Sequence, residues 1–325
     1  MRKLFYLVVI IGILVGIFRL VMYVKENFQE YLEEGLAHFA ESLEQEGEAE
    51  AEEATEEGDE GEEGATHNDT VSPEELAEGE VVAGPARGPN QQEIVEENGK
   101  FVFNYVFRNR QEKPRRWQWS FPKEAILERN REFGLPGDFW QRTYTSQAEM
   151  DQIIYKGYFV SNGSTMDVDY PRLTKRHMPI SRPLYELLLE DVGQNADFEE
   201  TIETLMRFCQ DIPYEVPPEY TGGRYVHELF PPSLMLIRGK GDCDSKSTLF
   251  TSILRHDARF KLVLVSTENP HHMYVGIKGV PKPYQDYFTF RGERYLVCEP
   301  VGPSRMNLGA LAFKESRITE VKPLF

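Results

Sequence analysis

The sequence is poor in cysteine, with three in 325 residues. They are Cys209, Cys243 and Cys298, and an odd number leaves at least one thiol free. A disulfide between Cys209 and Cys298 is compatible with the sequence. Because the chain has no His-x-His or Cys-x-x-Cys spacing, the sequence does not support a metal site. We therefore predict neither a metal nor a cofactor.

Basic residues are missing from residues 26–86, which contain 22 acidic side chains. Residues 1–25 carry four basic side chains and no acidic one, so the formal net charge of -18 arises in the acidic stretch. From Arg87 onward the chain holds 32 basic and 32 acidic residues and is neutral. A neutral globular region lacks the basic surface of a nucleic-acid-binding protein, so no nucleic-acid partner is predicted.

Charged residues are nearly missing from Leu4–Val24, where Arg19 is the exception. About 20 apolar residues span a bilayer as a helix, and an arginine near the end reaches the headgroups. No small-x-small cleavage site follows, which favours a retained single-pass membrane anchor over the alternative, a cleaved signal peptide. Arg2 and Lys3 favour a cytoplasmic N-terminus, so the globular region is predicted to lie outside the cytoplasm.

Aromatic residues alternate along two short runs. Residues 101–107 place an aromatic side chain at every second position, and residues 117–121 do so after a charged turn that contains proline. Such alternation is typical of strands, and the two runs predict an antiparallel hairpin. We expect the rings to pack on one buried face of the sheet. A stacking platform for bases or sugars is the alternative interpretation.

Further elements are predicted between the hairpin and the second half of the chain. The patterns indicate helices at residues 122–133, 184–189, 197–209 and 231–239 and a strand at 153–160. The third of these helices opens with a capping box, with Asp197 at the cap and Glu200 three residues later.

Residues 241–250 contain a glycine-bounded turn that leads into a helix predicted from Asp244 to about Ala258. Beyond Asp244 apolar side chains recur every three to four residues, as in a helix. Cys243 would then lie in the first turn, where free backbone N–H groups and the helix dipole lower a thiol pKa. Asp242 and Asp244 would raise that pKa if they pointed at the sulfur, and otherwise cap the helix. Lys246 is expected to pair with one of them.

Apolar strands follow the helix. One is predicted at residues 261–267; His272 opens the next, and Glu299 ends a third before a proline. With the cysteine of the preceding turn, they provide a nucleophile, a base and a group that orients the base. His272 is preferred to its neighbour His271, which is expected to lie in a loop. Helices come first and an antiparallel sheet follows, so the predicted class is α+β.

This arrangement resembles the transglutaminase-like branch of the papain-type fold, in which Cys, His and Asp or Glu follow in this order. The match is close to a subgroup found in archaea and bacteria that carries Glu in third place. The resemblance rests on Cys209–Tyr214, Gly241–Cys243, His272 and Leu296–Pro300. It extends over about residues 99–325, including the aromatic hairpin, and implies Cys243, His272 and Glu299 as catalytic residues.

The patterns and the resemblance together divide the chain into four predicted parts. Residues 1–25 are a cytoplasmic tip and transmembrane helix, and residues 26–89 are an acidic juxtamembrane helix and disordered linker. Residues 90–196 are the β-hairpin and helical part of the globular region. Residues 197–325 are a transglutaminase-like catalytic core.

The resemblance implies a thiolate that attacks a carboxamide carbonyl and forms an acyl-enzyme. Release to water would make the protein a protease or amidase, and release to an amine would make it a protein-crosslinking transglutaminase. We favour hydrolysis of a protein or peptide substrate, by analogy at the level of the fold. A non-catalytic binding or scaffold domain of the same fold is the competing hypothesis. The presence of all three residues argues against it.

Overall fold

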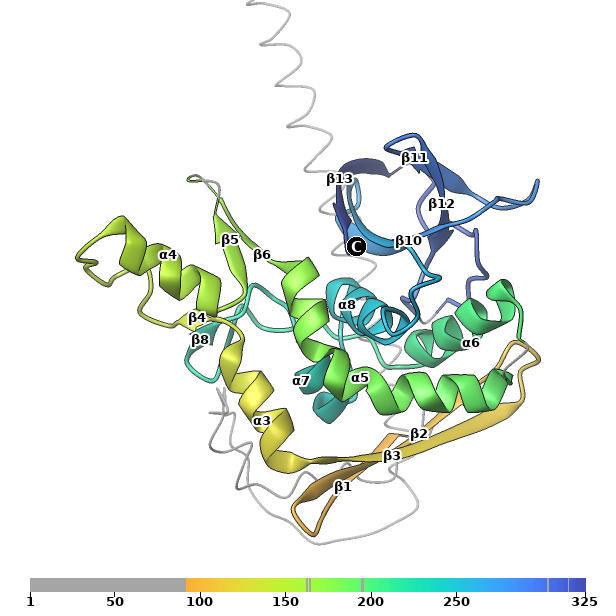
Figure 1. The fold of residues 1–325 in the computed structure, drawn as a ribbon, viewed down its shortest axis with the longest axis horizontal. Coiled ribbons are helices and arrows are strands. Elements are labelled where there is room, and N and C mark those ends of the chain that lie inside the picture. Colours follow the sequence, from red (N-terminus) through yellow and green to blue (C-terminus); the bar gives the residue numbers. More distant parts are fainter. Residues whose placement is uncertain (1–91, 162, 164, 194–195, 303, 315) are drawn as a thin grey trace, which may run out of the picture. The chain divides into compact units, whose positions relative to one another are not determined.

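The computed structural model describes residues 92–325 except 162, 164, 194, 195, 303 and 315 (Figure 1). The predicted membrane anchor and acidic linker lie outside the described residues, so both stay predictions. Within the described part of the chain, no helix is long and apolar enough to cross a bilayer.

The described chain begins with a three-stranded antiparallel sheet in the order β1-β2-β3. Its strands are β1 (Gln92–Glu97), β2 (Lys100–Arg108) and β3 (Pro114–Pro122). Strands β2 and β3 confirm the predicted hairpin, and β1 adds an outer strand that the aromatic pattern does not indicate.

The aromatic rings of the hairpin pack inward. Phe103 stacks on Trp119 with ring centroids 4.9 Å apart, and Trp117 stacks on Phe208 of helix α6 (Phe198–Gln210) at 4.7 Å. These four residues are at most 6% exposed. The core-packing interpretation is therefore confirmed, and the stacking-platform interpretation is wrong because covered rings cannot stack on a ligand.

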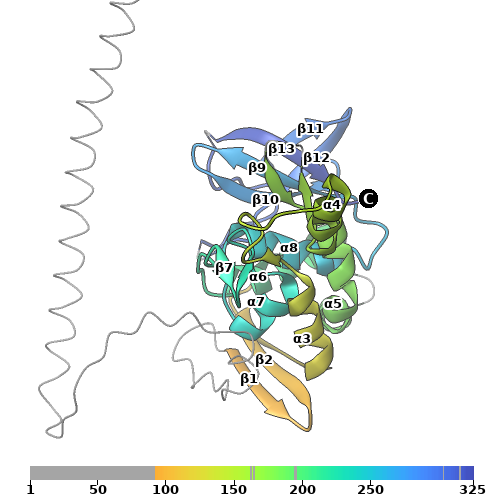
Figure 2. The ribbon, with the colours of Figure 1, turned by 90° about the vertical axis from the view of Figure 1, so that its left-hand side faces the viewer.

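The second half of the chain supplies a five-stranded sheet in the order β11-β12-β10-β9-β13, with every pairing antiparallel. Its strands are β9 (Leu262–Glu268), β10 (His272–Lys278), β11 (Tyr287–Phe290), β12 (Glu293–Cys298) and β13 (Arg317–Pro323). Three of them confirm the predicted strands. Helices separate this sheet from the hairpin sheet (Figure 2), so the fold is α+β with antiparallel sheets.

The other helices described are α3 (Lys123–Glu132), α4 (Gln147–Lys156), α5 (Tyr170–Val192), α7 (Pro232–Arg238) and α8 (Cys243–Leu254). Short strands connect them. The strands β4 (Leu135–Pro136), β8 (Arg224–Tyr225) and β7 (Tyr220–Thr221) form one small sheet, and β5 (Phe159–Ser161) pairs with β6 (Met166–Val168).

The strand predicted at residues 153–160 is wrong over most of its length. Residues 153–156 end helix α4, and strand β5 occupies only the end of the predicted range. Ser146 fixes the start of α4, because its hydroxyl accepts a hydrogen bond from the backbone N–H of Glu149 at 3.2 Å. A short apolar run fits a helix and a strand equally well, and here the upstream cap decides between them.

Helix α5 is much longer than the helix predicted at residues 184–189. It contains Pro179 and Pro183, and prolines inside a helix remove hydrogen bonds, which is why sequence patterns favour a later start. Asp169 caps the true start by accepting a hydrogen bond from the backbone N–H of Arg172. Eight buried side chains along α5 stabilise the helix from outside itself.

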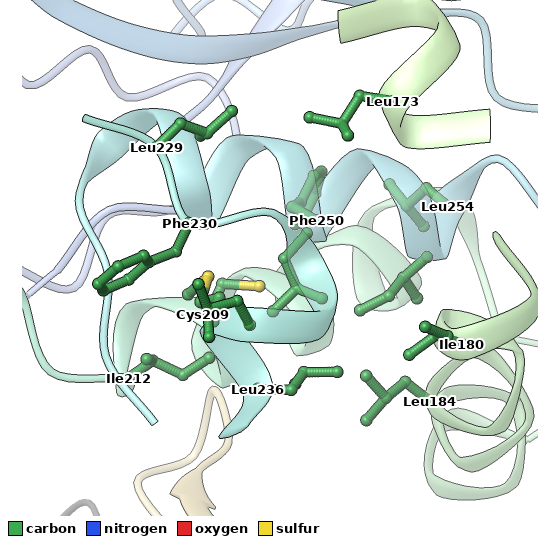
Figure 3. Close-up of a cluster of buried hydrophobic side chains, with 14 of the residues drawn as sticks. Leu173, Ile180, Leu184, Cys209, Ile212, Leu229, Phe230, Leu236, Phe250 and Leu254 are labelled. Atoms are coloured by element: carbon green, nitrogen blue, oxygen red, sulfur yellow. The ribbon is translucent and has the colours of Figure 1, made fainter. Parts of the chain in front are cut away.

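Helix α8 lies at the centre of the core and contacts α5, α6, α7 and β10. All ten residues from Ser245 to Leu254 are buried. Figure 3 shows how helices distant in sequence supply the surrounding side chains, which include Leu173, Ile180, Leu184, Cys209 and Leu236. The core therefore holds the start of α8, where Cys243 lies, in a fixed position.

Candidate active site

The turn before Cys243 is shaped by close packing. The carboxylate of Asp242 accepts a hydrogen bond from the backbone N–H of Ser245 at 3.0 Å and caps helix α8. A Cβ atom at Gly241 would lie 2.9 Å from the Cβ of Ser245. The turn needs glycine because the cap brings these atoms together, which confirms the predicted capping role of Asp242.

The thiol of Cys243 lies between its own helix and strand β10. Its Sγ donates a hydrogen bond to Oδ1 of Asp244 at 3.2 Å, and the backbone of Met273 lies near enough to the sulfur to oppose the rise of the thiol pKa. One turn along α8, the hydroxyl of Ser247 donates to the carbonyl oxygen of Met273 at 3.3 Å. These contacts hold the thiol beside the residue that follows His272.

His272 and Glu299 are brought into contact by the sheet. The Nε2 atom of His272 lies 2.7 Å from Oε2 of Glu299, whose side chain is 1% exposed. Strands β10 and β12 pair with Val275 opposite Cys298, and this register places Glu299 diagonally to His272, two residues from the directly opposite position. The alternation that places Tyr295, Val297 and Glu299 on one face predicts a direct cross-strand contact with His272, whereas the contact observed is diagonal.

The pKa of the Cys243 thiol is raised and not lowered. Burial is the largest cause, followed by the carboxylates of Asp244 and Asp242. Burial and the Asp244 carboxylate also raise the pKa of Asp242, to about 7. The predicted lowering by the helix start is wrong for this arrangement, because burial and the two carboxylates together disfavour the thiolate. The thiol is neutral at pH 7 until a base takes its proton.

The segment that precedes the site is tied to it by two side chains. Gln210 donates from Nε2 to the carbonyl oxygens of Glu299 and Met306 at 2.7 and 3.0 Å. The ammonium of Lys246, which is fully buried, donates to the carbonyl oxygen of Ile212. The predicted pairing of Lys246 with a flanking aspartate is thus replaced by a bond to the backbone. Burial lowers the lysine pKa to about 8.

The remaining candidates of the sequence lie apart from this arrangement. Cys209 and Cys298 are buried free thiols, so the disulfide that the sequence allowed between them is not formed. His271 is exposed in the loop before β10, as expected, and His272 is the histidine that reaches Glu299. The role of Gln210 was missed by sequence reasoning. Its position within the segment that carries the family resemblance was the available signal.

Three potential metal ligands gather at the start of α8. One donor atom each from Asp242, Cys243 and Asp244 lies within 4.8 Å of the others. The first carboxylate already caps the helix, and the second accepts hydrogen bonds from the thiol and from the hydroxyl of Tyr170, the latter at 2.7 Å. Because internal hydrogen bonds engage both carboxylates, we assign no metal to them.

Two exposed aromatic rings flank the site. Phe313 is 43% exposed and meets the His272 ring edge to face, with centroids 5.2 Å apart. Tyr214 is 50% exposed and follows the segment tied down by Lys246. Burial, and then the nearby Cys243, raise the tyrosine pKa to about 12. The reacting groups therefore lie beside apolar surface that a polypeptide could contact.

No protein-family model and no curated protein match this chain. Among solved structures, LapG of Legionella pneumophila in an EGTA-treated form is 15% identical, with a TM-score of 0.29 over 48% of this chain and 77% of LapG. The calcium-bound form gives 14% identity and a TM-score of 0.30 over 47% and 81%. A protein described as a TGase is 11% identical, with a TM-score of 0.26 over 67% and 69%.

Proposed function

We propose that this chain is a transglutaminase-like cysteine enzyme that hydrolyses peptide or amide bonds through Cys243, His272 and Glu299. One observation carries the proposal. The imidazole of His272 is fixed by a buried carboxylate at 2.7 Å, while the thiol lies against the backbone of the next residue, Met273. A thiol, an imidazole and an orienting carboxylate in this order are the components of a cysteine-type acyl transfer site.

The hydrogen bond to Glu299 sets the tautomer of His272. A carboxylate accepts only, so Nε2 carries the proton and Nδ1 is left as the basic nitrogen. Burial keeps the thiol neutral, so Cys243 depends on a general base to remove its proton during the attack. A thiolate already paired with an imidazolium would not need this step. His272 takes the thiol proton as the sulfur attacks, and Glu299 stabilises the imidazolium.

The reaction then runs in two halves. The sulfur of Cys243 bonds to the carbonyl carbon, His272 returns a proton to the leaving amine, and a thioester remains. Water loses a proton to His272 and attacks the thioester, which releases a carboxylic acid and restores the thiol. The backbone N–H of Cys243, in the first turn of α8, is suited to stabilise the oxyanion.

The proposed location follows from the sequence. Leu4–Val24 would anchor the enzyme in a membrane by a single pass, with the acidic stretch as a spacer and the globular region outside the cytoplasm. The substrate would then be an extracytoplasmic protein or peptide.

Acyl transfer is tested on the full chain in detergent, with a mixture of unfolded proteins and a biotinylated primary amine. Hydrolysis predicts new protein N-termini detected by mass spectrometry, whereas protein crosslinking predicts biotin on glutamine side chains instead. Cys243→Ser should abolish either product while the melting temperature stays within about 2 °C, since one sulfur is replaced by oxygen at a half-buried position.

Cys209→Ser is the matched control, because it also removes one thiol but lies in the core away from His272. Provided that it folds, the Cys209→Ser variant should retain the turnover of the native chain. Turnover that survives Cys243→Ser would refute the mechanism. An intact, folded chain that gives neither product and no iodoacetamide adduct at Cys243 would support the scaffold hypothesis.

A further inference from the structure

A basic pocket of about 900 Å³ is lined by residues from the ends of helices α3 and α4, the first half of helix α5 and strands β4 and β8. Its lining includes six cationic side chains: Arg131, Lys156, Arg172, Lys175, Arg176 and Arg224. Glu132 is the acidic residue that lines it. Since the chain from residue 87 onward is neutral, this is a strong local excess of positive charge.

Three of the arginines already use their guanidinium groups inside the protein. Arg176 donates from Nε to Oε2 of Glu132 at 2.7 Å. Arg224 donates to the carbonyl oxygen of Phe133 at 2.8 Å. Arg172 lies over the ring of Tyr155, 3.7 Å from the ring centroid. The guanidinium groups that could bind a phosphate group through two parallel hydrogen bonds are therefore largely occupied by partners within the protein.

Two lysines in the pocket are free to meet a ligand. Lys156 and Lys175 are exposed, and neither forms an ion pair with any described residue. Arg131 adds a third outward charge, since its contact with Glu124 is long, at 3.8 Å, and its side chain is 60% exposed. Arg172 covers one face of the Tyr155 ring, but the residue is still 62% exposed and supplies apolar surface among these charges.

We propose that this pocket binds an acidic stretch of a partner polypeptide. Lysine ammonium groups act as point charges on flexible stems, which suits several carboxylates spread along a chain better than one compact phosphate. The volume lies in the upper range of ligand pockets and accommodates several residues. The two available lysines and the arginine provide charge, and the exposed tyrosine ring provides packing.

The pocket shares the first turn of α5 with the candidate active site. The hydroxyl of Tyr170, the first residue of α5, donates to Oδ2 of Asp244 at 2.7 Å, and Asp244 accepts the hydrogen bond of the Cys243 thiol. Arg172, two residues further along, lines the pocket. A polypeptide bound here would be held next to the element that contacts the active site. This inference concerns binding and stands independently of catalysis.

The proposal is tested by fluorescence anisotropy with a fluorescein-labelled octaglutamate peptide and the full chain in detergent at low salt. Binding should weaken about tenfold in Lys156→Gln/Lys175→Gln, because two exposed ion pairs are lost. It should weaken further in Lys156→Glu/Lys175→Glu. The matched control is Lys100→Glu/Lys113→Glu, which changes net charge equally at exposed lysines outside the pocket and should leave affinity within about twofold.

Equal weakening in the control, or no binding by the native chain, would overturn the proposal. So would displacement of the peptide by inorganic phosphate but not by chloride at equal ionic strength, because the pocket would then be a phosphate site. Circular dichroism verifies that each variant is folded. All binding measurements hold whether or not the protein turns over a substrate.

Discussion

The carboxylate of Glu299 satisfies two donors at once, and this makes Glu299→Gln an informative change. Oε2 lies 2.7 Å from Nε2 of His272, and Oε1 accepts the backbone N–H of Val301 at 3.2 Å. A glutamine has only one oxygen. If that oxygen stays with Val301, the amide NH₂ faces His272 and the ring must carry its proton on Nδ1, the nitrogen that should act as the base. If it turns to His272, the Val301 N–H loses its acceptor.

The expected loss follows from these two outcomes. A hydrogen bond to a charged group contributes about 1.5–3 kcal/mol, and the charge stabilises the imidazolium that forms during attack. Its removal corresponds to a fall in turnover of about 10- to 150-fold, and the wrong tautomer adds to it. We therefore expect kcat/KM to fall by about 10²-fold or more, and the pH at which Cys243 becomes alkylated to rise.

The assay combines turnover with the rate of iodoacetamide alkylation between about pH 5 and 10, read for Cys243 by mass spectrometry. Cys209 and Cys298, both buried, serve as internal references. The matched control is Glu203→Gln, which neutralises another buried carboxylate, one that accepts the backbone N–H of Leu308 at 3.2 Å. If Glu299→Gln matches the native protein in both turnover and alkylation, the orienting role is refuted.

Two further predictions follow from the structure and a third from the sequence. Asp244→Asn should lower the pKa of the Cys243 thiol and move its alkylation profile to lower pH, because it removes a carboxylate that raises that pKa; an unmoved profile contradicts this. Burial lowers the pKa of Lys246 from 10.5 to about 8, so the unfolded chain binds more protons between these values and stability rises with pH there. Urea unfolding of Lys246→Met should lack this rise, on the order of 3 kcal/mol; equal slopes would show that the native lysine is not desolvated. Membrane fractions should contain the intact N-terminus, and a mature N-terminus near residue 25 would disprove the anchor. A chain that begins at residue 90 should be soluble and monodisperse, and its aggregation would disprove the predicted boundary.

Local sequence rules were sufficient for the elements that carry the candidate site. The glycine turn, the Asp242 cap and the apolar spacing that follows them specify helix α8, whose first turn contains Cys243 as expected, although the helix ends at Leu254 and not near Ala258. Alternation likewise located strand β10 at His272 and strand β12 just before Glu299. These features depend on neighbours within a few residues of each other, so the sequence contains all the information that they require.

Where local signals were ambiguous, packing decided. The apolar run at residues 153–160 suits a helix or a strand, and the cap at Ser146 together with burial of Ile154 selects the helix for its first part. The prolines of α5 argue for a break that its buried face prevents. For α4 the deciding cap is local, whereas the contacts that stabilise α5 come from residues far away in the chain.

The chemistry of the site was decided by tertiary structure alone. The position of Cys243 at a helix start predicts a lowered thiol pKa, yet burial against β10 and the orientation of Asp244 raise it. The diagonal contact of His272 with Glu299 depends on the register of β10 against β12. Likewise, the basic pocket is assembled from five elements that are separate in sequence. Desolvation and charge–charge distances are properties of groups brought together through space, and the order of residues along the chain does not specify them.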